Sequence, residues 1–337
     1  MPANIQMAVS IKDIQKLREM TGAGLADCKK ALEESNGELE PAIEIIRKKG
    51  QAVAAKRSDR EASEGCVIVK VDGNFAAIIA LKCETDFVAN NADFVKLTQD
   101  ILDAAVAARC KTLDEVKALP MGKGTVADAV VDRSGITGEK MELDGYSVVE
   151  GECIAAYDHQ NKHTLCTMVA LNKVVEDATV GKNVAMQIAS ASPVAIDEQS
   201  VPQEVKDSEL RVAIEKTKEE QVAKAVEAAI RKTGVNPAHV DSDDHIESNM
   251  AKGWITPEQA QMVRELKVKV AAEKAANLPE QMIQNIAQGR LKKFFKENCL
   301  LEQEYIWDKT KTISQYLKEI DKDLTVTAFK RFTLRAE

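Results

Sequence analysis

Residues 1–55 carry apolar side chains at helical spacing in successive short runs. The first run follows Ser10, a residue type that caps helix N-termini, and it stops at the glycines of residues 21–24. An Asn-Gly pair at 36–37 interrupts the pattern again, and Gly50 is expected to end the last run. The pattern therefore predicts a module of three short helices. The apolar positions expected to share its core are Ile11, Ile14, Leu17, Leu25, Cys28, Leu32, Leu39, Ile43 and Ile46.

After a polar stretch, the apolar period changes from that of a helix to two, which is typical of a strand. Apolar residues alternate over 67–71 and 75–81, and the turn-forming sequence Asp-Gly-Asn at 72–74 separates them. Helical spacing returns over 94–104. We therefore predict that residues 56–147 form a first lobe, in which a helix covers the apolar face of a β-hairpin.

The order of strand, turn, strand and helix returns within residues 148–201. The segment 151–154 (Gly-Glu-Cys-Ile) is similar to 65–68 (Gly-Cys-Val-Ile), and a second hairpin and helix follow it. Residues 298–337 end in a predicted strand at 324–329, which is expected to complete this second lobe. The chain is therefore predicted to be an α+β protein with a two-lobed core built from a repeated unit.

Residues 202–297 interrupt the second lobe with long charged runs. Their apolar positions recur at helical spacing, which predicts an antiparallel hairpin of two long helices, a coiled coil inserted into the lobe. Glycines and prolines within 233–257 predict loops around a short helix at the tip. The expected seam residues are Val205, Val212, Val222, Val226, Ile230, Ile283, Ile286, Leu291 and Phe294.

Composition limits the kinds of partner. The 337 residues are 45% hydrophobic and 30% charged, enough to bury a core in several modules. The formal net charge is −8 with both signs interspersed, so no basic field is available for a phosphate backbone. Direct nucleic-acid binding is therefore not expected, and a protein partner is favoured.

The seven cysteines are scattered along the chain without a CxxC pair, which indicates reduced thiols and a cytoplasmic protein. Met1–Ser10 lacks the basic and apolar regions of a secretion signal, and no run approaches the roughly 20 apolar residues of a membrane span. We expect neither secretion nor membrane insertion.

Nucleotide-binding loops and catalytic sites are not expected. The sequence Gly-Lys-Gly-Thr at 122–125 lacks the upstream glycine of a phosphate loop, and the glycines of 21–24 follow a helix instead of a strand. Cys83 could pair with His159 as nucleophile and base, but Cys83 continues the apolar face of 75–81 and is expected to be buried.

Metal-binding side chains gather at Cys153, His159, His163 and Cys166. Their spacing resembles that of zinc ligands. However, His163 and Cys166 differ by an odd number of positions in a predicted strand, so they would face opposite sides of the sheet. We expect no metal site.

The segment 82–91 joins the first hairpin to the following helix and places Phe87 between Asp86 and Val88. Two interpretations fit this corner. Either Phe87 packs into the seam between sheet and helix while Asp86 caps the helix, or Phe87 projects toward a partner protein. Residue chemistry alone favours the first interpretation and leaves the second open.

Thr85-Asp86-Phe87-Val88-Ala89 resembles the signature of the elongation factor Ts family. Further segments resemble motifs of the same family in the same order, so the resemblance covers most of the chain. They are residues 21–32 (TGAGLADCKKAL), 289–294 (GRLKKF) and 329–332 (FKRF). The resemblance implies that the N-terminal module is of the ubiquitin-associated type.

Members of this family bind the GTPase elongation factor Tu and accelerate GDP release. The resemblance implies that this chain is an exchange factor without cofactor, metal or active site of its own. It implies that Asp86 and Phe87, flanked by Thr85 and Val88, intrude into the partner and disturb its magnesium and phosphate site. Burial of one Phe supplies only about 1.5–3 kcal/mol, so further contacts are expected.

Those further contacts are implied at Arg18, Leu25, Lys29, Gly138 and His159. Each position has an alternative role. Leu25 could belong to a helix core, Lys29 to a solvated face, Gly138 to a turn and His159 to an exposed hairpin tip.

Departures from the family concern the helical hairpin and the chain end. Extra sequence around 216–262 makes the hairpin longer than in shorter relatives; it could form a homodimer, contact the partner or extend into solvent. The chain stops soon after Phe332, so the additional C-terminal helix of some relatives is expected to be absent. Two other classes remain open: a ubiquitin-associated-type scaffold without exchange activity, and a thiol or metal enzyme using Cys83, His159 and His163.

Overall fold

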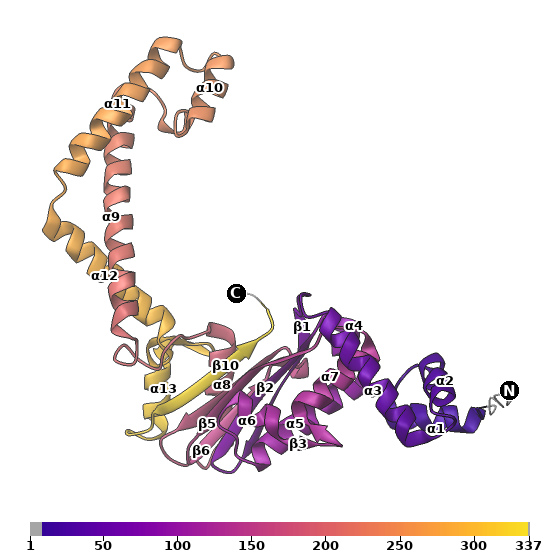
Figure 1. The fold of residues 1–337 in the computed structure, drawn as a ribbon. Helices are drawn as coiled ribbons and strands as arrows, with labels where there is room; N and C mark the ends of the chain where they lie inside the picture. The colour runs from indigo at the N-terminus through magenta and orange to yellow at the C-terminus, as the bar shows by residue number, and fades with distance from the viewer. Residues whose placement is uncertain (1–8, 336–337) are drawn as a thin grey trace. The chain divides into compact units, whose positions relative to one another are not determined.

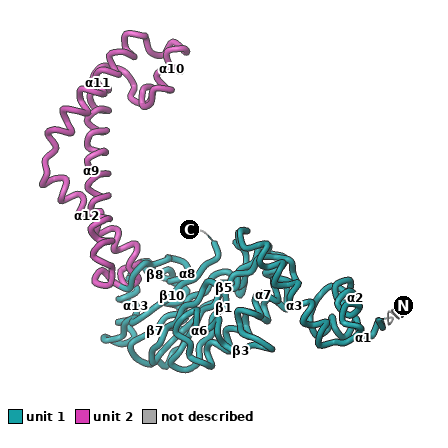
Figure 2. Tube along the Cα trace, in the orientation of Figure 1, with its two compact units in different colours: residues 1–196, 304–337 teal, residues 197–303 magenta. Residues whose placement is uncertain are grey.

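The structure is a computed structural model that describes residues 9–335. Most of Met1–Ser10, on which the expectation of no secretion signal rests, lies outside the described residues. The chain divides into two compact units, one formed by residues 1–196 with 304–337 and one by 197–303 (Figure 2). The finer division into four modules stays a prediction.

The N-terminal part of the first unit consists of helices around a small core of their own (Figure 1). Ser10 caps the first helix by accepting a hydrogen bond from the Asp13 N–H, and Gly22 ends it at φ 69°. Leu17, Cys28 and Leu32 are fully buried. The helices are α1 (Ile11–Thr21), α2 (Leu25–Glu34) and α3 (Leu39–Lys56).

Three expectations for this part are wrong. Ile11 is 75% exposed and lies outside the core. Leu25 is 49% exposed and not in the core, because the buried face of α2 begins one turn later at Cys28. Gly50 does not end α3, which continues to Lys56. The ubiquitin-associated type of this arrangement stays a prediction.

The first sheet is antiparallel, with the order β1-β2-β5. The predicted hairpin is present, with Asp72 opposite Phe75 across the turn. Residues 148–150, expected to open the second lobe, instead lie in β5, where Glu150 pairs with Phe75. The elements of this region are β1 (Glu64–Asp72), β2 (Phe75–Cys83), α4 (Asp86–Ala89), α5 (Ala92–Ala107), α6 (Leu113–Ala118), β3 (Pro120–Met121), β4 (Gly124–Thr125), α7 (Val126–Thr137) and β5 (Glu142–Glu150).

The second sheet repeats this plan, with the order β10-β7-β6. The strand predicted at 324–329 is present as β10 and extends to Thr333, which pairs with Leu165. The α+β class is therefore confirmed. The elements are β6 (Cys153–Asp158), the 3-10 turn η1 (His159–Asn161), β7 (Leu165–Leu171), α8 (Ala178–Ala191), β8 (Glu304–Tyr305), β9 (Asp308–Thr312), α13 (Ile313–Ile320) and β10 (Val326–Thr333).

The two sheets pack face to face, and apolar side chains, several of them alanines, fill the space between them. Ala76, Ile78 and Ala80 of β2 meet Met168 and Ala170 of β7 in one buried cluster. The opposite faces of the sheets are covered by α5 and α8, which gives a helix–sheet–sheet–helix order. Because β2 is buried on both faces, its sequence reads as a nearly continuous apolar run.

The second unit is an arm of long helices with a small folded tip (Figure 1). The returning side of the arm is divided into α11 and α12 by residues 277–279, and both helices contact α9. The tip has its own core, in which Val240, Ile246 and Val263 are fully buried. The elements are α9 (Gln203–Lys232), η2 (Pro237–His239), α10 (Asp243–Ala251), α11 (Pro257–Ala276), α12 (Glu280–Asn298) and η3 (Leu300–Glu302).

The seam predicted for α9 is wrong in its first half. Val205 and Val212 are exposed, whereas Ala213 and Thr217 are buried. The Thr217 hydroxyl donates to the Ala213 carbonyl at 2.6 Å, so this polar residue is satisfied inside the seam. The helix thus presents small side chains to its neighbours where the periodicity favoured valines.

Helices α3 and α7 cross in contact at a pair of glycines. A Cβ atom on Gly135 would lie 2.1 Å from the Cα atom of Gly50, a distance that real Cβ atoms do not adopt. Arg47 adds ion pairs to Asp128 at 3.4 Å and Asp132 at 3.6 Å beside the crossing. The close approach accounts for a glycine inside α3. The contact also fixes the N-terminal helices to the lobe that contains α7.

We predict that Gly135→Ala lowers the melting temperature, because the added methyl group forces the helix backbones apart at a cost of about 1–3 kcal/mol. Gly289→Ala in α12 is the matched control, since nothing lies within 4 Å of the added atom. This control should keep or raise the melting temperature. Calorimetry of the three proteins checks the prediction, and a wild-type melting temperature for Gly135→Ala would contradict it.

Candidate functional site

Phe87 projects from the corner that follows β2. Its side chain is 88% exposed, the largest fraction among the exposed large apolar side chains of residues 9–335. Of the two interpretations of this corner, the one in which Phe87 packs between sheet and helix is therefore wrong. Its neighbours Val88 and Ala89 take that place, because Ala89 is buried and Val88 packs against the same core. The corner is anchored on one side and exposed on the other.

The backbone of the corner is the four-residue helix α4. Thr85 is its N-cap, with its hydroxyl oxygen accepting from the Val88 N–H at 3.4 Å. The Asn90 side chain donates to the Asp86 carbonyl at 2.8 Å. Asn91 then caps α5 by accepting from the Asp93 and Phe94 N–H groups. The turn is thus closed by local caps at both ends.

Asp86 does not cap the helix by its side chain. It occupies the first turn of α4, where the helix dipole favours a negative charge. Its side chain is exposed, and within residues 9–335 its carboxylate has no hydrogen-bond or ion-pair partner. Asp86 and Phe87 therefore present a free carboxylate and a free aromatic ring side by side.

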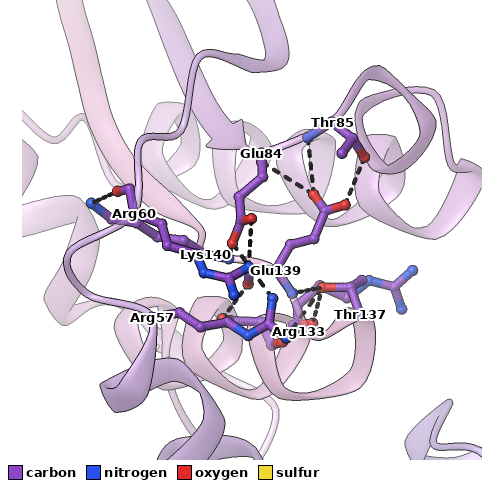
Figure 3. A network of polar contacts seen from close by, with 9 residues as sticks. Arg57, Arg60, Glu84, Thr85, Arg133, Thr137, Glu139 and Lys140 are labelled. Atoms are coloured by element: carbon purple, nitrogen blue, oxygen red, sulfur yellow. Dashed lines mark hydrogen bonds and ion pairs between the residues drawn. The ribbon is translucent and has the colours of Figure 1, made fainter.

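Glu139 holds the start of the corner from another part of the chain (Figure 3). One oxygen of its carboxylate accepts from the N–H groups of Glu84 and Thr85, each at 3.1 Å. The other oxygen accepts from the Thr85 hydroxyl at 2.6 Å. Hydrogen bonds to a charged acceptor are stronger than neutral ones, so this single side chain fixes two consecutive residues.

Glu84 makes the reciprocal contact. Its carboxylate accepts from the Lys140 N–H at 2.7 Å and from Arg60 at 3.0 Å, and it lies 3.7 Å from Arg57 (Figure 3). The hydrogen bond from the Lys140 backbone and then the contact with Arg60 lower the pKa of Glu84. Residues 84–85 and 139–140 are therefore joined by two carboxylates pointing in opposite directions.

Cys83 is a structural residue at the end of β2. Its thiol is fully buried and donates to the Thr85 carbonyl at 3.2 Å. Burial, reinforced by the nearby Glu139 charge, raises the pKa of Cys83 to about 12. The thiol is thus protonated at neutral pH and a poor nucleophile. His159 interacts with the Tyr157 hydroxyl, 3.2 Å from its Nδ1 atom, instead of Cys83.

His163 does not lie in a strand, contrary to the prediction for the metal-like cluster. His163 lies before β7 with a positive φ of 55°, outside any strand, and its Nδ1 atom is 2.5 Å from an Asp158 carboxylate oxygen. Cys166 is buried between the sheets, and burial raises its pKa. Across residues 9–335, no group of three or more His, Cys, Asp and Glu side chains is arranged to hold a metal ion.

The remaining implied contact residues lie in separate parts of the first unit. Arg18, Leu25 and Lys29 are exposed on α1 and α2, and Lys29 pairs with Glu33 at 3.8 Å. Gly138 is the C-cap of α7 at φ 73°, directly before Glu139. His159 is half-buried at the turn between β6 and β7, so it is not a fully exposed tip residue. Only Gly138 is brought next to the corner by the contacts described.

Sequence reasoning missed Glu84 and Glu139. The two residues are 55 positions apart, and neither belongs to a motif or to a periodic run. The one available signal was that the chain after β2 needs acceptors for N–H groups that have no strand partner.

The comparisons with known proteins agree with the motifs of the corner. The family model described as elongation factor TS matches residues 84–237 and 227–336. Elongation factor Ts of Phocaeicola vulgatus is 68% identical over 331 residues, which cover 98% of this chain and 100% of that protein. The chain belongs to the elongation factor Ts family. The resemblance inferred from the sequence motifs is therefore confirmed.

Two further elongation factor Ts proteins are similar to this chain over nearly its whole length. The protein of Bacteroides fragilis is also 68% identical over 331 residues, and that of Porphyromonas gingivalis is 44% identical over 332 residues. Each covers 98% of this chain and is itself covered completely. The family match begins at Glu84, the residue that starts the corner. No helix among the described residues has the length and apolar character needed to cross a membrane.

Acid should weaken the join between residues 84–85 and 139–140. The pKa of Glu84 is lower in the folded state than in the unfolded state. The charged form of Glu84 therefore stabilises the fold above the unfolded-state pKa of about 4.3. This stabilisation is lost as the pH falls through the folded-state pKa. We predict that the free energy of unfolding of Glu84→Gln depends less steeply on pH below about 4.3 than that of the wild type. Urea unfolding between neutral and acidic pH measures this difference, and parallel curves would contradict it.

Proposed function

We propose that this chain is a guanine-nucleotide exchange factor for elongation factor Tu, with no chemistry of its own. In this proposal the corner formed by Thr85, Asp86, Phe87 and Val88 enters the GTPase and promotes GDP release. The observation that carries it is the 88% exposure of Phe87 on a backbone fixed by hydrogen bonds. The family relationship supplies the GTPase and the direction of the effect.

Phe87 has the physical properties of a wedge. An exposed phenyl ring gives the fold little stability, but burying it in a partner contributes about 1.5–3 kcal/mol. Its ring is rigid, with only two side-chain torsions to fix on binding. Because Val88 and Ala89 anchor the same short helix to the core, the ring can press on a partner without the corner folding back.

Asp86 adds charge to the wedge. Its carboxylate has no partner in the described part of the chain. It could therefore accept hydrogen bonds from donors of the GTPase that insertion of Phe87 uncovers. The negative charge of Asp86 would also repel the phosphates of GDP and disturb the binding of the magnesium ion that they hold. In our proposal the magnesium and phosphate site is therefore disturbed by displacement and by charge together.

One wedge is not sufficient for strong exchange. Shifting a two-state equilibrium by about 10⁴-fold requires about 5.5 kcal/mol of differential binding, which exceeds the contribution of one aromatic ring. We propose Arg18, Leu25 and Lys29 on the N-terminal helices as a second docking surface, and their exposure supports this role. Gly138 and His159 are proposed as additional contacts in the first unit.

Binding of the factor and binding of GDP to the GTPase should oppose each other. Binding linkage requires that GDP weakens the affinity of the factor as much as the factor weakens that of GDP. No cofactor is needed, and the net charge of −8 disfavours nucleic acid as a direct partner. We place the reaction in the cytoplasm, and we propose the helical arm of residues 202–297 as a surface for homodimer formation.

The proposed function predicts that this chain increases the rate at which elongation factor Tu releases fluorescently labelled GDP. The rate should rise with factor concentration and saturate, because release occurs from a complex of the two proteins. Stopped-flow fluorescence with excess unlabelled GDP measures it. A scaffold without exchange activity would bind the GTPase and leave the release rate unchanged at saturation, and that result would refute the proposal.

Phe87→Ala should lower the saturating release rate by about ten- to a hundredfold, the equivalent of the lost burial. Its melting temperature should stay close to that of the wild type, because Phe87 is exposed in the free protein. Trp307→Ala is a matched control, since Trp307 is an aromatic residue of the same unit with 63% exposure. An unchanged release rate for Phe87→Ala would remove Phe87 from the mechanism.

A further inference from the structure

We propose that Glu139 is a positioning residue for nucleotide exchange, which sets the direction in which Asp86 and Phe87 project. This inference rests on the proposed function, because it assigns Glu139 a role only through the corner. Glu139 does not contact the ring of Phe87. It acts through the backbone of Glu84 and Thr85, the two residues immediately before Asp86.

The corner needs an external support because its own structure is short. Helix α4 has four residues, and helices of this length are not stable by themselves. The pairing of β2 with β1 ends at Cys83, and its pairing with β5 ends at Lys82. The N–H groups of Glu84 and Thr85 therefore lie beyond the sheet, and the Glu139 carboxylate accepts their hydrogen bonds in place of a neighbouring strand.

The end of α7 presents Glu139 in a defined geometry. Gly138 ends the helix in the left-handed region at φ 73°, which turns the chain back toward the corner. The Ser134 hydroxyl then donates to the Glu139 carbonyl at 2.5 Å. The Glu139 N–H donates to the Thr137 hydroxyl at 3.3 Å (Figure 3). Gly138 thus has a conformational role that does not require contact with a partner.

Helix α7, which leads to Glu139, also contacts α3, and α3 packs against the helices that bear the proposed docking surface of Arg18, Leu25 and Lys29. Helix α7 is fixed to α3 by the contact of Gly50 with Gly135, and Arg57 at the end of α3 lies 3.7 Å from the Glu84 carboxylate. The N-terminal helices and the corner are thus held by one pair of helices. Glu139 makes the hydrogen bonds between that pair and the backbone that leads to Phe87.

The test compares Glu139→Ala, which removes the acceptors, with Glu139→Gln, which keeps one oxygen that can accept from both N–H groups. Release of labelled GDP from elongation factor Tu is measured over a range of factor concentrations. We expect Glu139→Ala to lower the saturating rate about tenfold while the half-saturating concentration changes less than about twofold. Glu139→Gln should recover most of the rate.

A double mutant separates positioning from general loss of structure. If Glu139 acts through Phe87, adding Glu139→Ala to Phe87→Ala should change the saturating rate little further. Glu115→Ala is the matched control, because the Glu115 carboxylate also accepts from two consecutive N–H groups, those of Lys111 and Thr112, at the start of α6. This control should exchange at the wild-type rate.

Several results would overturn the inference. These are a wild-type rate for Glu139→Ala, a Glu139→Gln rate as low as that of Glu139→Ala, and an equal loss from Glu139→Ala with and without Phe87. If Glu139→Ala does not fold, Glu139→Asp provides the same comparison, since it keeps the charge and shortens the reach by one methylene. An unaffected Phe87→Ala would instead refute the proposed wedge, and the inference with it.

Discussion

The hydrogen bonds that join residues 84–85 to 139–140 fix the exposed corner of residues 85–88, on which the proposed function depends. Two carboxylates cross in opposite directions, so each segment both donates and accepts. The corner needs these bonds because the strand pairing of β2 ends at Cys83. Phe87 is exposed and contributes no packing of its own. Fixed geometry at an exposed apolar residue needs polar anchors next to it, and Glu139 and Glu84 provide them.

The packing of the first unit determines the positions of Glu84 and Glu139. Face-to-face packing of the sheets buries β2 on both sides, so the strand leading into the corner is rigid. The contact of Gly50 with Gly135 allows α3 and α7 to approach closely enough for both of their C-terminal ends to reach the corner. The exposed residues of α1 and α2 are carried by the same helices. In the proposed function, burial of Phe87 contributes only a few kcal/mol, so the exposed residues of α1 and α2 would have to add binding energy.

The second unit follows a different physical plan. Its arm is a long helix, α9, packed along two successive helices, and its tip has a separate apolar core. The seam uses Ala213 and Thr217 at positions where larger side chains would separate the helices. Charged residues cover the outer faces, with pairs such as Arg290 and Glu220 joining neighbouring helices. This plan suits an extended surface, in contrast to the layered core of the first unit.

The sequence by itself determined the class of the fold, the first hairpin, the final strand, the N-terminal helices and the family. Each of these follows from periodicity, turn residues or motifs, which involve residues close together in the sequence. Tertiary structure decided what depends on distant residues. Leu25 looks like a core residue by spacing, and residue chemistry alone favours burial of Phe87. Only the absence of a covering element in the folded chain leaves both side chains exposed. Gly50 looks like a helix end until Gly135 is found against it. Glu84 and Glu139 have no shared pattern, since hydrogen bonds between residues 55 positions apart arise only when the chain has folded and brought donors and acceptors together.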